Sequence, residues 1–72
     1  MKVSKSQCLL YIYNLLVLKG EFSREEVLTK LEIPALTFHR YVQELKAFIS
    51  NFELDFDLVY DRNQQKYQLI KR

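Results

Sequence analysis

Arg40 and Gln43 are the side chains in this sequence best suited to directed hydrogen bonding from an exposed surface. An arginine can pair with guanine in a bidentate manner, and a glutamine can do the same with adenine. The two residues are three positions apart, so on a helix they can point the same way. Thr37, one turn earlier, can bond a phosphate or contact a thymine methyl group. These types and spacings predict contact with base edges. The alternative is that Arg40, Gln43 and Lys46 are ordinary solvated helix residues.

The element that must position these side chains is a helix predicted over about residues 34–50. Its apolar face is set by spacings of four, three and four positions, in Phe38, Val42, Leu45 and Ile49. The opposite face then carries Thr37, Arg40 and Gln43, with His39 and Lys46 at its edges. Pro34 is expected to be the first helical residue, where a missing N–H costs nothing.

Two further helices are predicted before this one, over about residues 5–18 and 24–31. Gly20 marks the end of the first helix, whose core face carries Leu9, Ile12, Leu15 and Leu16. Ser23 is a good N-cap for the second helix, and Glu26 completes a capping box. The second and third helices, joined by a tight turn, form a helix-turn-helix.

A β-hairpin is predicted over about residues 56–70, because the pattern changes there to alternation. Asn63 is the residue of its polar connection best able to take a left-handed conformation. Arg62 and Lys66 would lie at the tip, where they could neutralise phosphates, as could Lys46 on the third helix. The predicted fold is mainly α with a small β-hairpin, namely a winged helix-turn-helix with a three-helix core and a wing. The chain, residues 1–72, is expected to form a single domain.

The motif resembles that of bacterial winged-helix transcriptional regulators of the Mga-like and DeoR-like group. The resemblance lies in Glu25-Glu26-Val27-Leu28, Leu31, Ile33, Thr37-Phe38, Arg40-Tyr41-Val42, Leu45 and the hairpin segment Lys66-Tyr67-Gln68-Leu69. In that group, the start and outer face of the third helix contact DNA. The resemblance implies such a role for the matching positions, which are Ala35, Leu36, Thr37, His39, Arg40 and Gln43.

The amino-acid composition limits the classes of function that the protein can have. The net charge is only +2, but the charges are sorted, since residues 1–20 and 62–72 carry bases without acids and residues 51–61 carry acids without bases. A basic face for DNA is therefore compatible with a nearly balanced total. With one cysteine and one histidine, and without a glycine-rich phosphate loop, the sequence predicts no enzyme, cofactor, metal site or evident small-molecule site. The lone Cys8 favours a cytoplasmic protein, and no apolar run is long enough to span a membrane.

The first helix carries more apolar residues than one core face needs, and this predicts a partner interface at Leu10, Tyr11, Val17 and Leu18. The partner would be a second copy or a larger regulator. The alternative is that the hairpin and residues 51–56 cover this surface. Taken together, the sequence predicts sequence-specific binding of double-stranded DNA in bacterial transcription regulation. The rival interpretation is a winged-helix module for protein–protein interaction without DNA binding.

Overall fold

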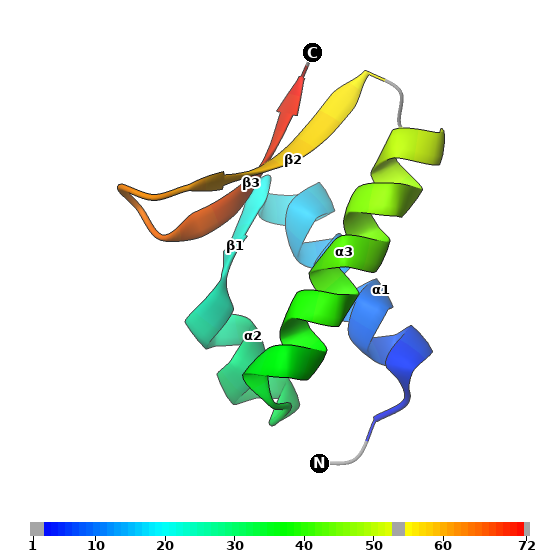
Figure 1. Ribbon diagram of the computed structural model, residues 1–72, viewed down its shortest axis with the longest axis vertical. Coiled ribbons are helices and arrows are strands. Elements are labelled where there is room, and N and C mark those ends of the chain that lie inside the picture. Colours follow the sequence, from blue (N-terminus) through cyan, green and yellow to red (C-terminus); the bar gives the residue numbers. More distant parts are fainter. Residues whose placement is uncertain (1–2, 53–54, 72) are drawn as a thin grey trace.

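Three helices and three short strands make up the fold. A computed structural model describes residues 3–52 and 55–71. Along the chain the elements are α1 (Lys5–Lys19), β1 (Glu21–Ser23), α2 (Arg24–Leu31), α3 (Ala35–Phe52), β2 (Phe56–Asp61) and β3 (Lys66–Lys71) (Figure 1). This arrangement confirms the predicted winged helix-turn-helix. Among the described residues, no helix combines the length and the apolar character needed to cross a membrane.

The first two helices match their predicted ranges to within one residue. The amide of Gln7 donates to the Ser4 hydroxyl at the start of α1, and Gly20 ends the helix with a left-handed φ of 76°. At α2 the predicted capping box is confirmed, because the Glu26 amide donates to Ser23 Oγ and the Ser23 amide donates to the Glu26 carboxylate, both at 3.1 Å. These caps satisfy amides that a helix start otherwise leaves without partners.

The turn between α2 and α3 differs from the prediction by one residue. Glu32 takes the left-handed conformation that closes α2, with φ 54°. Pro34 is not the first residue of α3. It lies just before the helix, and its carbonyl oxygen accepts the Phe38 amide at 3.0 Å. Proline suits this position because it needs no amide partner of its own. The helix then continues to Phe52, two residues beyond the predicted end.

The sheet contains a strand that the sequence did not predict. β1 pairs antiparallel with β3, which pairs antiparallel with β2, so the order is β1-β3-β2. In this register Phe22 of β1 faces Tyr67 of β3, and Tyr67 faces Tyr60 of β2. A segment of three residues is too short to show alternation, so β1 depends on its pairing with β3.

The loop of the hairpin also differs from the prediction. Its left-handed residue is Gln65, with φ 55°, and not Asn63. The Asp61 carboxylate accepts the amides of Asn63 at 2.9 Å and Gln64 at 3.3 Å. These bonds fix the first part of the loop as an Asx-type turn, so the reversal of the chain is completed at Gln65.

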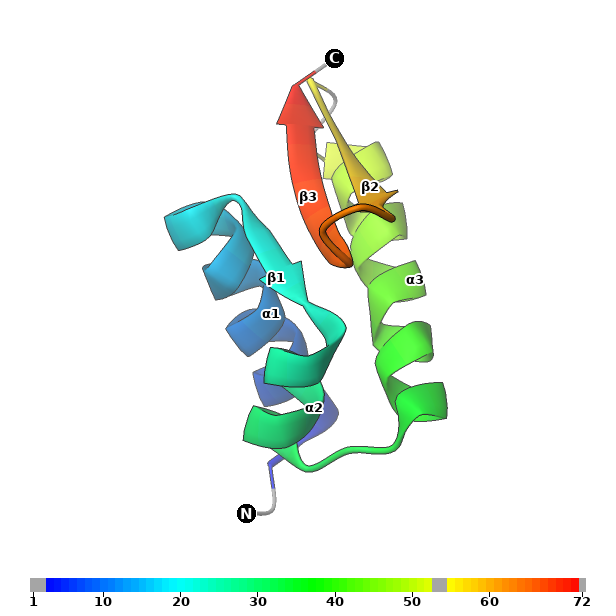
Figure 2. The same ribbon diagram turned by 90° about the vertical axis from the view of Figure 1, so that its left-hand side faces the viewer.

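An aromatic cluster joins the helices to the sheet at the centre of the core. The ring of Phe22 stacks on Tyr67 with centroids 5.2 Å apart, and Phe38 meets both rings edge-on. Cys8 is also buried in this core. Figure 2 shows α1 and α3 on opposite sides of this core, with β3 and β2 near the upper half of α3.

The outer side of α1 remains uncovered. Leu10, Val17 and Leu18 keep 67%, 61% and 72% of their surface in solvent, whereas Tyr11 is half-buried and packs against the core. Three of the four apolar side chains are therefore exposed and Tyr11 contributes less of its surface, while the partner interface itself stays a prediction. From the sequence, residues 51–56 are one part of the chain that could cover this surface instead. Of these, residues 53 and 54 lie outside the described residues.

Candidate nucleic-acid interface

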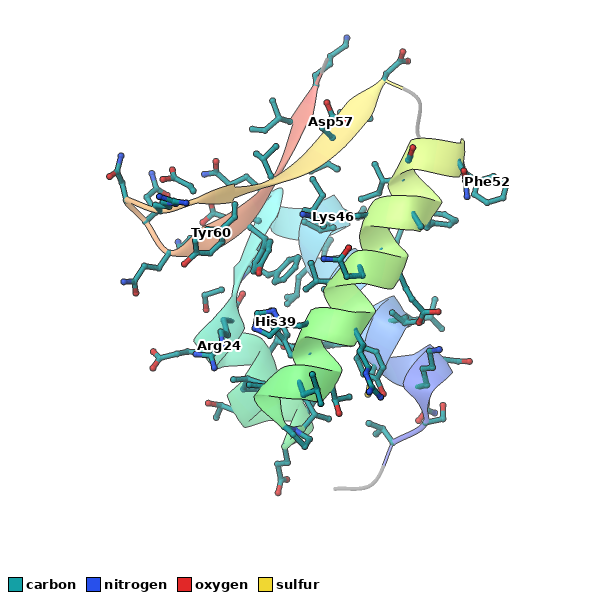
Figure 3. All side chains as sticks on the ribbon, in the orientation of Figure 1. Arg24, His39, Lys46, Phe52, Asp57 and Tyr60 are labelled. Carbon is teal, nitrogen blue, oxygen red and sulfur yellow. The ribbon has the colours of Figure 1, made fainter. Side chains whose placement is uncertain are left out.

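The outer face of α3 presents polar side chains in the order that helical geometry dictates. The core face carries Phe38, Val42, Leu45 and Ile49, all buried. At 100° per residue, Arg40 and Gln43 point away from that face, and both are exposed. His39 and Lys46, also exposed, lie on the flank of α3 that faces α2 and the sheet (Figure 3).

Other residues expected at this face are placed less favourably. Thr37 is half-buried and shares the opposite flank of α3 with Glu44, whose carboxylate pairs with Lys5 of α1 at 2.9 Å. It therefore does not point with Arg40 and Gln43 as directly as the spacing suggested. Ala35 is half-buried, while Leu36 keeps 65% of its surface in solvent. The start of α3 thus offers an apolar contact and few hydrogen-bond donors.

The cations of the protein divide into paired and unpaired groups. Lys5 pairs with Glu44, Lys19 pairs with Glu26 at 3.2 Å, and Lys66 pairs with Glu21 at 2.6 Å. Within residues 3–52 and 55–71, no ion pair engages Arg24, Lys30, Arg40 or Lys46 of the helix-turn-helix, or Arg62 and Lys71 of the hairpin. The two lysines of α1 are paired with carboxylates of the same chain, and these six cations are not.

Lys66 occupies a different position from the one predicted. It is the first residue of β3, and the tip of the wing is formed by residues 62–65. The hydrogen bond between the two side chains lowers the pKa of Glu21 below 4.5 and raises the pKa of Lys66 above 10.5. Both groups therefore stay charged over the neutral range. Lys66 could contact a phosphate only while it is also paired with Glu21. Arg62 has no ion-pair partner among the described residues.

Arg24 and Tyr60 belong to this face, although the sequence did not single them out. Tyr60 lies 4.9 Å from Tyr67 between ring centroids and remains 46% exposed. Burial raises the pKa of Tyr67, and the neighbouring Tyr60 raises it further. The positive charge of Arg24 lowers it. Figure 3 shows Arg24, His39 and Tyr60 on the same side of the molecule. In the sequence, Arg24 could have been recognised as a basic residue that directly follows the N-cap Ser23.

This arrangement can contact an extended anion at several points. Arg40 and Gln43 supply directed donors from the outer face of α3, Arg24 supplies a charge from the first turn of α2, and Arg62 supplies one from the wing. Exposed cations on three separate elements suit a phosphate backbone better than a single small ion. Among the described residues, no group of three or more His, Cys, Asp or Glu side chains could hold a metal ion.

The comparisons with known proteins support the fold. A DNA-binding winged-helix protein from Sulfolobus Spindle-shaped Virus 1 superposes with a TM-score of 0.66. The match covers 97% of this chain and 100% of the viral chain, with 21% sequence identity. No family model and no curated protein sequence matches the chain. At this identity the similarity establishes a shared winged-helix architecture.

Proposed function

We propose that this protein binds double-stranded DNA, with α3 in the major groove and the wing against the phosphate backbone. The proposal rests on the observation that some cations are held in ion pairs and others are not. Arg24, Arg40, Lys46 and Arg62 have no ion-pair partner among the described residues, and they lie on the helix-turn-helix and the wing. A duplex offers phosphates on both sides of a groove wide enough for an α-helix.

Each side chain has a defined role in the proposed complex. Arg40 and Gln43 point away from the core and would read base edges, Arg40 favouring guanine and Gln43 favouring adenine. Arg24 would contact a phosphate from the start of α2, Arg62 would contact one from the tip of the wing, and Lys46 would contact one near the sheet. A viral protein described as DNA-binding shares this fold, which supports DNA as the partner. Placing the second motif helix in the major groove follows the general docking of helix-turn-helix domains.

In its finer form, the proposal is sequence-specific binding in transcription regulation, without catalysis. This part rests on the resemblance of the motif to bacterial regulators of the Mga-like and DeoR-like group. A protein of that kind would work on DNA in the bacterial cytoplasm. Arg40 and Gln43 would supply the sequence preference, because the phosphate contacts carry no sequence information.

The test is a fluorescence-anisotropy titration of a labelled mixed-sequence duplex at several salt concentrations. With three phosphate contacts, the logarithm of the association constant should fall against the logarithm of salt concentration with a slope of about −2.7. Affinity would then drop roughly 40-fold between 50 and 200 mM salt. Absence of binding at 50 mM salt, or binding that salt does not weaken, would overturn the proposal.

Matched charge removals locate the contact. Arg24→Ala and Arg62→Ala should each reduce the size of the slope by about one. Lys5→Ala removes the same charge from the paired group on α1, and should leave the slope near that of the wild type. Equal losses in all three variants would indicate attraction to net charge alone and would count against a defined face.

A second candidate function is a protein-interaction module with the same fold. The exposed Leu36 at the start of α3 favours this alternative, because the first turn of a recognition helix is where polar contacts to DNA concentrate. Leu36→Ser tests whether this side chain is needed for binding to DNA. It should leave the binding of mixed-sequence DNA within about two-fold if α3 enters the groove, since the phosphate contacts remain.

A further inference from the structure

The outer side of α1 carries a stripe of side chains that the DNA face does not use. Gln7, Leu10, Asn14 and Val17 follow one another at spacings of three, four and three positions. All four are exposed, and they lie opposite the buried Ile12 on the other side of the helix. This spacing is that of the seam between two packed helices, where polar residues at some positions fix register and partner number.

A groove follows the same stripe. It has a volume of about 520 Å³ and is lined by Gln7, Leu10, Tyr11, Tyr13, Asn14 and Val17. A second groove of about 270 Å³ adjoins it between α1 and α3, and Leu10 and Tyr13 line both. Its far wall includes Phe48, whose ring meets Tyr13 edge-on with centroids 5.6 Å apart. A ridge of side chains from another helix would therefore find hollows on both sides of Leu10.

The charge distribution along α1 is compatible with a second copy of the same surface. No residue from 6 to 18 is charged, so two copies would bring no like charges together along the stripe. The lysines that bound the stripe are compensated internally, Lys5 by Glu44 at 2.9 Å and Lys19 by Glu26 at 3.2 Å. Asn14, near the middle, has an amide that both donates and accepts, so it can pair with its own symmetry mate.

The exposed area is in the range that a homodimer requires. Large apolar side chains contribute roughly 60–120 Å² each when fully buried. Scaled by their exposure, Leu10, Val17, Leu18 and Phe48 with the two half-buried tyrosines give on the order of 300 Å². Because an interface is about 60% apolar, the footprint is roughly 500 Å² per copy. A pair would bury about 1,000 Å², at the lower end of specific interfaces.

We infer that a second copy of this chain docks on the α1 stripe, so that the protein forms a symmetric homodimer through α1. Figure 1 shows α1 on the side of the molecule away from the hairpin, so this pairing leaves the wing and the outer face of α3 accessible. The inference does not depend on DNA binding. An interface of this size falls among weak or transient contacts, so the dimer should be sensitive to protein concentration.

The experiment is sedimentation equilibrium of the full chain from 5 to 500 μM. The wild type should approach twice the chain mass of 8.7 kDa as concentration rises. Leu10→Glu and Val17→Glu should each weaken association at least 30-fold, because they place a like-charged pair in the seam. Ile70→Glu alters an exposed apolar residue of β3 and should leave the association constant unchanged within two-fold.

A crosslink tests the position of the seam. Asn14→Cys, treated with oxidised glutathione, should give a disulfide-linked dimer in which two thiols are oxidised. Asn63→Cys on the wing tip should form no disulfide-linked dimer, and the native Cys8 is buried in both variants. A wild type that remains monomeric at 500 μM overturns the inference. So does association that survives Leu10→Glu, or crosslinking equal at Asn14 and Asn63.

Discussion

Replacement of Phe22 by alanine is the perturbation that most directly probes how the sheet is joined to the helices. Phe22 is 1% exposed, although it lies on a strand of only three residues. Its ring stacks on Tyr67 at 15° with centroids 5.2 Å apart, and meets Phe38 at 80° with centroids 6.2 Å apart. The side chain therefore contacts the central strand and α3 at once.

The size of the loss follows from this burial. Removal of a buried phenylalanine costs about 3–5 kcal/mol, and aromatic pairs add about 0.5–1.5 kcal/mol each beyond their area. With two such pairs at Phe22, we expect the upper part of the range, about 4–5 kcal/mol. At about 0.05–0.15 kcal/mol per residue, a chain of 72 residues has a total stability of roughly 4–11 kcal/mol. Phe22→Ala should therefore be largely or wholly unfolded at the lower end of that scale.

Urea denaturation followed by far-ultraviolet circular dichroism measures the effect. Phe22→Leu keeps most of the volume and should lose about 1–2 kcal/mol, which keeps the experiment informative if the alanine variant does not fold. Leu36→Ala, at an exposed position of α3, should change stability by no more than about 0.5 kcal/mol. The reasoning would be refuted if Phe22→Ala lost less than 1 kcal/mol, because β1 would then contribute little to the core.

Three further predictions concern the capped ends and the ion pair. Gly20→Ala should cost roughly 1–2 kcal/mol in urea denaturation, because φ is 76° there although the space around it is open; an unchanged stability would contradict a left-handed cap. Ser23→Ala should cost about 1 kcal/mol through loss of the α2 cap, and a loss near zero would argue against the hydroxyl bond. The ion pair of Glu21 and Lys66 should contribute stability at neutral pH, since the pKa of Glu21 is lowered and that of Lys66 is raised. The contribution is full above pH 4.5 and lost as pH falls through the folded pKa of Glu21. On the alkaline side it is full below pH 10.5 and lost as pH rises through the folded pKa of Lys66. Glu21→Gln should flatten both limbs of the stability–pH profile, and identical profiles would exclude the pair.

Local signals in the sequence determined most of the helical part of the fold. Ser23 with Glu26 defined the start of α2, and Gly20 defined the end of α1, because capping depends on residues within one turn of each other. The spacing of Phe38, Val42 and Leu45 similarly identified the buried face of α3. These features need no knowledge of the rest of the chain.

Features that depend on distant pairing were not predictable in this way. β1 exists because Glu21–Ser23 pairs with β3, more than forty residues along the chain. The same pairing brings Glu21 to Lys66, and so removes a cation that the sequence assigned to phosphate contact. Arg24 joins the candidate DNA face because α2 follows β1 directly. Each of these features depends on the pairing of β1 with β3.

The most direct test of the central proposal is a map of the DNA contact by nuclear magnetic resonance. The ¹⁵N-labelled protein is titrated with a mixed-sequence duplex at constant protein concentration, and amide shifts are followed residue by residue. The account predicts changes over residues 36–46 and 62–65 and at Arg24, with the α1 stripe from Gln7 to Val17 unchanged. Changes confined to α1, with α3 and the wing unaffected, would contradict it.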